Sequence, residues 1–405
     1  MPSLSPTNYK LLELQDKDLI KFTRAQNSLS WRGQLTAEQY VEREFVCGKG
    51  RMTSQKVIVF MLVNEDDPEQ RVGSIELLIR KGLRYDNDDE NHKVLENDIL
   101  CGTIGSVFTY PEHRGRGVGQ IMVNKLIEIA KSKYLGPKGF IFLYSEVGEY
   151  YTRNGFKSYE VPLAKFPLGK KMNYNPENSD NLNYEYIKYK NFINLLDLYN
   201  HQFRTDLIDK VKEDGKTRVS INPSEDYIDW FHLRAKYLAS KIFDKASDMS
   251  LLSYDEIIDK FQKIEPSIFG IKVSKDSEVV GGIIWTYEWS RNKVTKENEN
   301  TVTVLKIIVD KKYSTEEVSK QLILRMKSYL ESSTTVPSLK NFQQVVIWQS
   351  DLNSSLCQWI EGNLDGKINQ TNSSLSAILL NNDVDKEKLL NDDLIWEGND
   401  KLPWW

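Results

Sequence analysis

One stretch restricts the fold of this chain more than any other: an apolar run that continues into a glycine-rich loop and a helix. Ile99–Phe108 has the β-branched, apolar character of a strand and ends just before a proline. The loop that follows contains Gly115, Gly117 and Gly119. The helical pattern of Ile121–Ala130 begins directly after the loop. We expect an anion-binding cradle here, because the first N–H groups of a helix point outward and glycine permits close approach to the backbone.

The spacing of this loop separates it from the common phosphate loops. Arg114 and Arg116 add two positive charges that suit phosphate oxygens. A Walker A loop would end in Gly-Lys-Ser/Thr, and a dinucleotide fingerprint would read G-x-G-x-x-G, whereas this loop reads G-x-G-x-G. The pattern that remains is Arg-x-x-Gly-x-Gly, which resembles the pyrophosphate-binding motif of the GNAT superfamily of acetyl-CoA-dependent N-acetyltransferases. The alternative interpretation is a glycine-rich turn that caps an ordinary helix.

A second motif follows one helix and one strand later. Lys138–Ser145 has the pattern of a buried strand, and the box Tyr-x-x-x-Gly-Phe comes soon after it, with Tyr151, Gly155 and Phe156 at its fixed positions. The box predicts a short helix that ends at an Asn-Gly C-cap, with a strand after it. Tyr150 is expected to point to another face of that helix. With two motifs in the right order, the chain is identified as a member of the GNAT superfamily.

The resemblance implies an α/β fold with a mixed sheet and a site for acetyl-CoA between two strands of it. The backbone of Val107 and Thr109 would pair with the pantetheine arm and polarise the thioester carbonyl. The residues expected to bind the cofactor are Val107, Phe108, Thr109, Arg114, Gly115, Arg116, Gly117, Val118, Gly119 and Gln120.

The order of predicted elements divides the chain into three segments. Residues 1–165 read as a complete GNAT acetyl-CoA-binding catalytic domain, within which the acidic segment Tyr85–Asn97 is expected to be a mobile excursion. Residues 166–190 have the composition of a linker. Residues 191–405 repeat the order of elements, but the loop Asp310–Ser314 has no glycine at the position of the cradle. We therefore expect a degenerate GNAT-like domain that closes the substrate site; an unrelated α+β domain is the alternative.

Composition excludes several classes of function. The net charge of −4 and the pI of about 5.8 provide no basic field for nucleic acid or an anionic membrane. Three dispersed cysteines favour a reduced, cytoplasmic location over a disulfide framework. Four histidines without metal-ligand spacing predict no metal site, and no apolar run reaches the length of a membrane span.

Further segments, most of them outside the two superfamily motifs, resemble the fungal lysine N6-acetyltransferase family, which acetylates the side-chain amine of free L-lysine in lysine catabolism. They are Asn27–Gly33, Tyr40–Glu44, Ile104–Thr109 and the closing Ile395–Trp405. The resemblance implies direct transfer from acetyl-CoA to lysine in a ternary complex. The alternatives are acetylation of another small amine or a protein N-terminus and, from a different class, a non-catalytic acyl-CoA-binding module. The sequence does not indicate the oligomeric state.

The resemblance also implies roles for individual side chains. Tyr151 matches the tyrosine that protonates the leaving thiolate in this superfamily. Glu146, just past the strand, is a candidate general base. The terminal carboxylate of Trp405 is a second candidate, because the layout resembles the "enhanced intracellular survival" aminoglycoside acetyltransferases, which have a terminal carboxylate in the active site. Trp31 and Trp404 would pack against the methylene stem of lysine.

Overall fold

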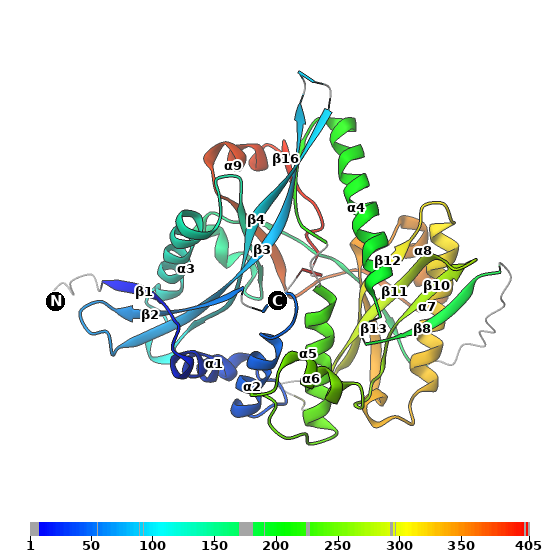
Figure 1. Cartoon of the computed structure of the whole chain (residues 1–405), viewed down its shortest axis with the longest axis horizontal. Helices are drawn as coiled ribbons and strands as arrows, with labels where there is room; N and C mark the ends of the chain where they lie inside the picture. Colours follow the sequence, from blue (N-terminus) through cyan, green and yellow to red (C-terminus); the bar gives the residue numbers. More distant parts are fainter. Residues whose placement is uncertain are drawn as a thin grey trace.

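Two mixed β-sheets with helices on their faces make up the protein. The computed structural model describes residues 8–54, 56–88, 90–91, 93–169, 181–189, 191–223, 227–291, 295, 297–400 and 402–403. Within these residues a nine-stranded sheet lies in the first half and a seven-stranded sheet in the second. The two sheets stand side by side, and the long helix α4 (Ile193–Asp214) lies between them (Figure 1). This mixed α/β arrangement confirms the predicted fold class.

The first sheet runs in the order β1-β2-β3-β4-β5-β15-β6, with β9 and β16 attached beside β3. Its elements from the first half are β1 (Tyr9–Glu13), α1 (Lys17–Trp31), α2 (Ala37–Cys47), β2 (Val57–Asn64), β3 (Arg71–Asp88), β4 (Lys93–Thr109), α3 (Val118–Ile129), β5 (Phe140–Ser145) and β6 (Lys157–Tyr159). Alternate residues of β3 face opposite layers. Ile75 and Leu77 pack in one core with α3, whereas Ser74 and Glu76 contact α1 on the other side.

The second sheet runs in the order β14-β7-β13-β12-β11-β10-β8. Its strands are β7 (Leu163–Pro167), β8 (Asn183–Lys188), β10 (Ile268–Lys275), β11 (Glu278–Glu288), β12 (Asn300–Val309), β13 (Phe342–Trp348) and β14 (Lys367–Gln370), with the helices α5 (Tyr227–Ile242), α6 (Tyr254–Phe261), α7 (Thr315–Ser332) and α8 (Ser354–Asn363).

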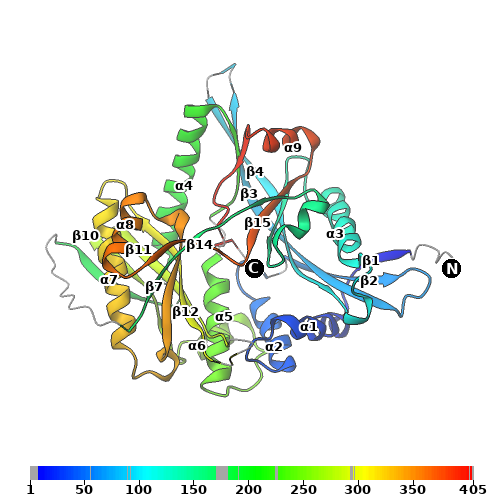
Figure 2. The ribbon, with the colours of Figure 1, turned by 180° about the vertical axis from the view of Figure 1, so that it is seen from behind.

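The two halves exchange strands. β15 (Leu375–Leu380), from near the end of the chain, pairs with β5 and β6 in the first sheet, and β7 pairs with β13 and β14 in the second. Figure 2 shows β15 among the strands of the first half and β7 among those of the second. The three predicted segments stay a prediction: residues 166–190 begin inside β7 and contain β8, and residues 170–180 and 190 lie outside the described residues.

The expectation of a mobile excursion at Tyr85–Asn97 is wrong. β3 and β4 stay paired in a long hairpin as far as Asp88 and Lys93. The reason is non-local, because β9 (Thr217–Ile221) pairs with β3 from Gly82 to Tyr85, at the start of this stretch, and α4 packs on Tyr85 and Val94. Tyr85 has no exposed surface in that contact. Burial of this ring against α4 offsets the polarity of the surrounding sequence.

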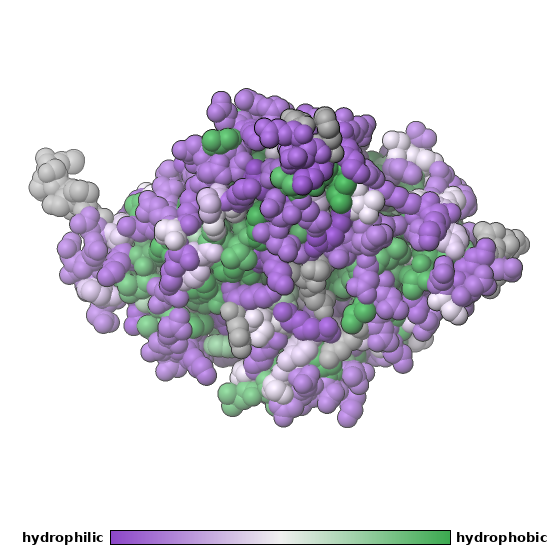
Figure 3. All heavy atoms as spheres, turned by 45° about the horizontal axis from the view of Figure 1, so that its top comes forward, coloured by the Kyte–Doolittle hydropathy of each residue, from purple (hydrophilic) through white to green (hydrophobic). Residues whose placement is uncertain are grey.

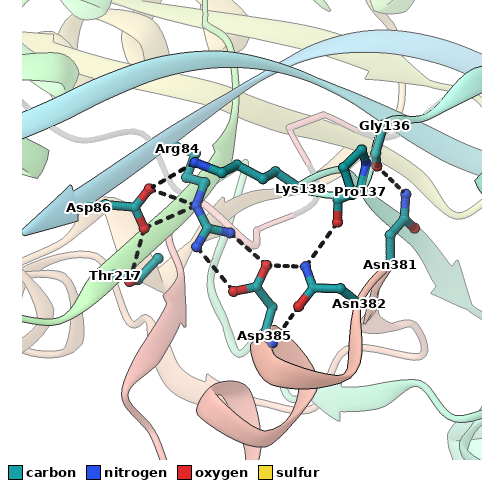
Figure 4. A network of polar contacts seen from close by, with 9 residues as sticks. All are labelled: Arg84, Asp86, Gly136, Pro137, Lys138, Thr217, Asn381, Asn382 and Asp385. Atoms are coloured by element: carbon teal, nitrogen blue, oxygen red, sulfur yellow. Dashed lines mark hydrogen bonds and ion pairs between the residues drawn. The ribbon is translucent and has the colours of Figure 1, made fainter.

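A polar network fastens the C-terminal segment to the first sheet (Figure 4). The Arg84 guanidinium on β3 donates to both oxygens of Asp385 on α9 (Asp383–Leu390), at 2.7 and 3.0 Å, and also to Asp86. Asn382, the N-cap of α9, donates to the carbonyl oxygen of Pro137 at 2.8 Å. The last strand, β16 (Leu394–Trp396), then pairs in parallel with β9. These contacts fix the path that the chain follows toward its end.

The outer surface is largely hydrophilic on the face shown in Figure 3, where apolar residues gather in separate groups. In the part of the chain that the structure describes, no helix combines the length and apolarity needed to cross a membrane.

Candidate active site

The glycine loop forms an open cradle at the start of α3. Gly115 and Gly117 have φ values of 75° and 73°, a left-handed conformation that favours glycine. A Cβ built at either position would meet no atom within 4 Å, so the space in front of the loop is free. Gly117 is the N-cap of α3, and no described side chain caps the helix. The first amides of α3 are therefore available to an anion in front of the loop.

The charges and side chains around the cradle also suit a pyrophosphate. Arg114 and Arg116 are exposed, and Arg114 Nε donates to the carbonyl oxygen of Thr109 at 3.0 Å while its guanidinium lies 5.1 Å from the centre of the Phe108 ring. The side chain of Val118 is buried, so it offers an anion only its backbone. The predicted cofactor residues therefore lie together, and the loop fits the diphosphate of coenzyme A.

β4 and β5 separate next to this loop, and we call the opening between them, where β4 is partly exposed, the cleft. The two parallel strands pair only from Cys101 to Ile104 on the β4 side. Beyond that point Gly105, Ser106 and Val107 are partly exposed. The backbone groups of β4 released from pairing need other partners, and a ligand arm laid along the strand supplies them.

Tyr151 lies in a short 3₁₀ segment, Gly148–Asn154, that follows β5, and it packs in the same core as α3. The predicted C-cap is confirmed, since Gly155 has φ 89°. The ring of Tyr151 is 9% exposed and packs edge-on against Phe156. Burial, and then the neighbouring Tyr150 and Glu146, hold the pKa of Tyr151 above its ordinary value. The phenol is therefore protonated at neutral pH and can act as a proton donor.

Tyr150 is a candidate that the sequence did not reveal. Its ring stands edge-on to Tyr151 with 5.2 Å between ring centres, and the Arg153 guanidinium lies 4.2 Å from its centre. Its hydroxyl reaches the start of α3, since a Cβ on Gly119 would come within 2.9 Å of it and within 3.5 Å of the Thr109 hydroxyl oxygen. The two adjacent tyrosines thus lie in different places: Tyr150 beside the cofactor loop and Tyr151 in the core against Phe156.

Trp31 and Glu146 meet across the mouth of the cleft. Trp31, the last residue of α1, donates from Nε1 to a Glu146 carboxylate oxygen at 3.3 Å. Its ring packs edge-on against Phe108 of β4. An aromatic surface beside a carboxylate suits an acceptor with an apolar stem and a cationic amine. The structure therefore brings together two residues that lie 115 positions apart in the sequence.

The end of the chain approaches the same face of the first sheet. Trp404 and Trp405 lie outside the described residues. Pro403, just before them, is buried, and its carbonyl oxygen accepts a hydrogen bond of 2.5 Å from Arg80 on β3. The Tyr144 hydroxyl on β5 donates to the carbonyl oxygen of Asp400 at 2.6 Å.

The cysteines and acidic residues offer no second chemistry in the described part of the chain. Cys47, Cys101 and Cys357 are free thiols, and the first two are buried. Burial raises the pKa of Cys47 to about 12, which makes it a poor nucleophile. No group of three or more His, Cys, Asp or Glu residues within the described ranges could hold a metal ion.

Comparisons with known proteins agree with this geometry. A family model described as an acetyltransferase (GNAT) domain matches residues 58–158, and one described as the LYC1 GNAT-like C-terminal domain matches residues 170–405. An uncharacterized protein of Saccharomyces cerevisiae is 26% identical over 426 residues, which cover 96% of each chain. A protein of Yarrowia lipolytica named lysine acetyltransferase is 32% identical over 117 residues, 29% of this chain and 28% of that one.

A solved structure shows the same fold. A GCN5-related N-acetyltransferase from Anabaena variabilis superposes with a TM-score of 0.52 at 11% identity, over 94% of this chain and 74% of that chain. At this identity the likeness concerns the fold alone. The family matches carry the assignment, since one covers the strand, loop and helix of the cradle and the other more than half of the chain. The chain therefore carries a GNAT acetyltransferase domain and belongs to the LYC1 GNAT-like family.

Proposed function

We propose that this protein transfers the acetyl group of acetyl-CoA to the side-chain amine of free L-lysine, as a cytoplasmic step of lysine catabolism. The observation that carries acetyl transfer is the open glycine cradle at the start of α3, together with the buried, protonated Tyr151 in the segment that follows β5. The lysine assignment is supported by the resemblance of the sequence to fungal lysine N6-acetyltransferases and by the partial match to a relative named lysine acetyltransferase.

Binding of acetyl-CoA would use backbone more than side chains. The amides that begin α3, with Arg114 and Arg116, would hold the diphosphate. The backbone of Val107 and Thr109, past the point where β4 leaves β5, would direct the pantetheine arm into the cleft. When bound, acetyl-CoA supplies a thioester carbon that an amine can attack.

Recognition of lysine would use the mouth of the cleft. Trp31, and Trp404 from the tail, would pack on the methylene stem, and the Glu146 carboxylate would attract an ammonium group. The carboxylate of Trp405 is a second candidate for this role or for the general base.

Transfer requires two proton movements. A lysine ammonium has a pKa of about 10.4, so it must lose a proton to a base before or during attack. The amine nitrogen then bonds to the acetyl carbon, and the carbon–sulfur bond breaks. The Tyr151 phenol donates its proton to the departing sulfur, which leaves as a thiol, and the phenolate then regains a proton, through water, from the nitrogen as it becomes the amide.

The test is release of free thiol from acetyl-CoA with a panel of acceptors: free amino acids, polyamines, aminoglycosides and peptides. We expect the highest kcat/KM with free L-lysine and a product acetylated on the side chain, identified by mass spectrometry. Activity on peptide N-termini or another small amine, without activity on lysine, would overturn the substrate assignment. Binding of acetyl-CoA without thiol release for any acceptor would favour a non-catalytic acyl-CoA-binding module.

A further inference from the structure

A buried carboxylate lies at the point where the cleft begins. Glu76 on β3 is 1% exposed and pairs in register with Gly105 of β4. Just after Gly105 the register shifts, because Ser74 pairs with Phe108 and β4 holds one extra residue. Ser106 takes a φ of 53° in this bulge. Bulges of this kind redirect a side chain from its place in the pleat.

The carboxylate of Glu76 faces the guanidinium of Arg24, but one of its oxygens has no hydrogen-bond partner among the described residues. The Arg24 Nε atom of α1 lies 3.6 Å from Glu76 Oε1, beyond hydrogen-bonding distance. Both atoms are buried, and neither has a hydrogen-bond partner among the described residues. A buried carboxylate oxygen left in this state costs free energy unless function compensates for it.

The other charges that face Glu76 come from α2. Tyr40 is buried and neutral, because burial and then Glu44 raise its pKa. Arg43 occupies the Glu44 carboxylate with hydrogen bonds of 2.8 and 2.6 Å. Burial raises the pKa of Glu76, and Arg24 offsets the shift only in part. A carboxyl with a raised pKa is a better match to proton transfer near neutral pH than an exposed one.

Ser106 connects this carboxylate to the cleft. It is partly exposed where β4 has left β5, and its hydroxyl donates to Glu76 Oε2 at 3.4 Å. Trp31 lies seven positions after Arg24 on α1, so it is on the same helix face, about 10 Å further along the axis. The cleft thus has one carboxylate at its mouth, beside Trp31, and another at its floor, behind Ser106.

We propose that Glu76, acting through the Ser106 hydroxyl, accepts the proton of the acceptor amine, and that Arg24 keeps Glu76 ionised until then. One proton of the acceptor's ammonium group moves to Ser106 Oγ, and the hydroxyl proton of Ser106 moves to Glu76. The net result is that the Glu76 carboxylate gains one proton. The proton returns to water when product leaves. This inference rests on the proposed acetyl transfer but not on lysine as the acceptor.

Glu146 is less suited to this step. It is exposed, and its carboxylate already accepts a hydrogen bond from Trp31 at the mouth of the cleft. A solvated carboxylate in that place can attract an ammonium group without removing its proton. The structure therefore separates a binding carboxylate from a proton-accepting one.

The test compares pH profiles of kcat/KM for the acceptor that the panel identifies. Glu76→Gln should lower kcat at pH 7 by about 100-fold and shift the acidic limb of the profile, while acetyl-CoA affinity stays within about twofold. Glu76→Asp should recover part of the rate, and Ser106→Ala should lower kcat by about tenfold. Glu42→Gln is the matched control, since Glu42 is also buried and pairs with Lys241 at 2.8 Å for structure alone.

A second measurement separates proton transfer from support of the fold. With an aminooxy analogue of the acceptor, which is neutral at the assay pH, the Glu76→Gln defect should shrink to less than about fivefold. An equal defect with both acceptors, or a profile unchanged in Glu76→Gln and altered in Glu146→Gln, would overturn the proposal. Failure of lysine in the panel, with these pH effects intact on another amine, would overturn the substrate assignment alone.

Discussion

The two halves of this protein share an order of strands and helices, and the place in the second half that corresponds to the cleft, which we call the second cleft, is completed in the opposite way. In the first half, β4 and β5 separate beyond Ile104, and the loop before α3 leaves an uncapped helix start. In the second half, β12 and β13 separate beyond Val304, and α7 follows. The Ser314 side chain caps α7 by accepting a hydrogen bond from the Glu317 amide at 3.4 Å. Glu316 and Glu317 place negative charge in the first turn of this helix. An anion is therefore favoured at the first helix start and opposed at the second.

Side chains and the tail also occupy the second cleft. Lys306, two residues beyond the last pairing, binds Asp351 at 2.5 Å and lies 3.8 Å from Asp400 of the tail. Burial would lower the pKa of Lys306, but Asp351, Tyr199 and Asp400 outweigh it, so the pKa lies above its ordinary value. Ser350 donates to Asp400 at 3.2 Å. These contacts anchor the end of the chain in the second half.

The second half keeps the order of strands and helices of the first half without its glycine loop. Each sheet needs a strand from the other half, so the second domain is required by the first even without a ligand of its own. The tail spans both, since Asp400 uses its side chain in the second half and its carbonyl oxygen in the first.

The largest difference between the clefts should appear when the glycine loop is filled. Gly117→Val places a β-branched side chain at φ 73° in front of the helix start. We expect acetyl-CoA affinity to fall about 1000-fold, roughly 4 kcal/mol at 1.4 kcal/mol per tenfold, measured by calorimetry. Lys312→Ala, in the corresponding loop of the second half, should leave affinity unchanged. Equal losses in both variants would contradict the assignment of the cofactor to the first cleft.

In the second half, a substitution in the Lys306 cluster should lower the free energy of unfolding. Lys306→Met leaves two buried carboxylates, Asp351 and Asp400, without their cation, so we expect the free energy of unfolding to fall by about 3 kcal/mol in urea titrations. Acetyl-CoA affinity should stay unchanged at a temperature where the fold is intact. Adding Asp351→Leu to this variant should recover part of the loss. A stability equal to that of the parent protein would show that this cluster is not an anchor.

Within the first cleft, the adjacent tyrosines should separate chemistry from binding. Tyr151→Phe removes the proton donor, so we expect kcat to fall about 100-fold with little change in acetyl-CoA affinity. Tyr150→Phe removes a hydroxyl beside Gly119, so we expect the KM for acetyl-CoA to rise about fivefold while kcat holds. Steady-state kinetics with both substrates varied measures these effects, and the reverse pattern would exchange the two roles.

The parts of the fold that could be predicted are those specified locally. The strand predicted within Lys138–Ser145, which the structure has at Phe140–Ser145, and the C-cap at Gly155 both follow from neighbouring residues, and both are confirmed. The strand exchange could not be predicted, because β15 and β7 look like ordinary strands and their partners lie far away in the sequence. Tyr85 illustrates the same limit, since only contact with α4 explains its burial.

The residues of the site also divide into those that the sequence could predict and those that it could not. The cofactor loop is a contiguous motif, so its residues could be named from the sequence. Glu76 gives no such signal, because it is a single glutamate in a strand and gains its place only through Arg24 and the bulge at Ser106. Tyr150 was assigned to a different face from Tyr151, but the sequence does not show that this face looks onto Gly119.

The tail offers a smaller test of how the first cleft depends on the second. Removing Trp404 and Trp405, or extending the chain by a few residues, displaces the terminal carboxylate while Pro403 stays in contact with Arg80. We expect kcat/KM for lysine to fall about tenfold and acetyl-CoA affinity to stay unchanged, because only the acceptor side is altered. Full lysine turnover in both variants would exclude the terminus from the site.

The smallest effect should come from the network that fastens α9 to the first sheet. Arg84→Lys keeps the charge but loses the paired hydrogen bonds to Asp385, at 2.7 and 3.0 Å, because an ammonium group cannot match the planar fork of a guanidinium. We expect a loss of about 1 kcal/mol in unfolding free energy, measured by urea titration, with kcat unchanged. Lys386→Ala is the control, since Lys386 is on the same helix as Asp385 but its salt bridge is to the exposed Asp383. If Arg84→Lys lowers kcat without lowering stability, this end of the first sheet affects the cleft directly. The C-terminal segment that contains β15 and α9 would then affect the chemistry of the first half as well as its stability.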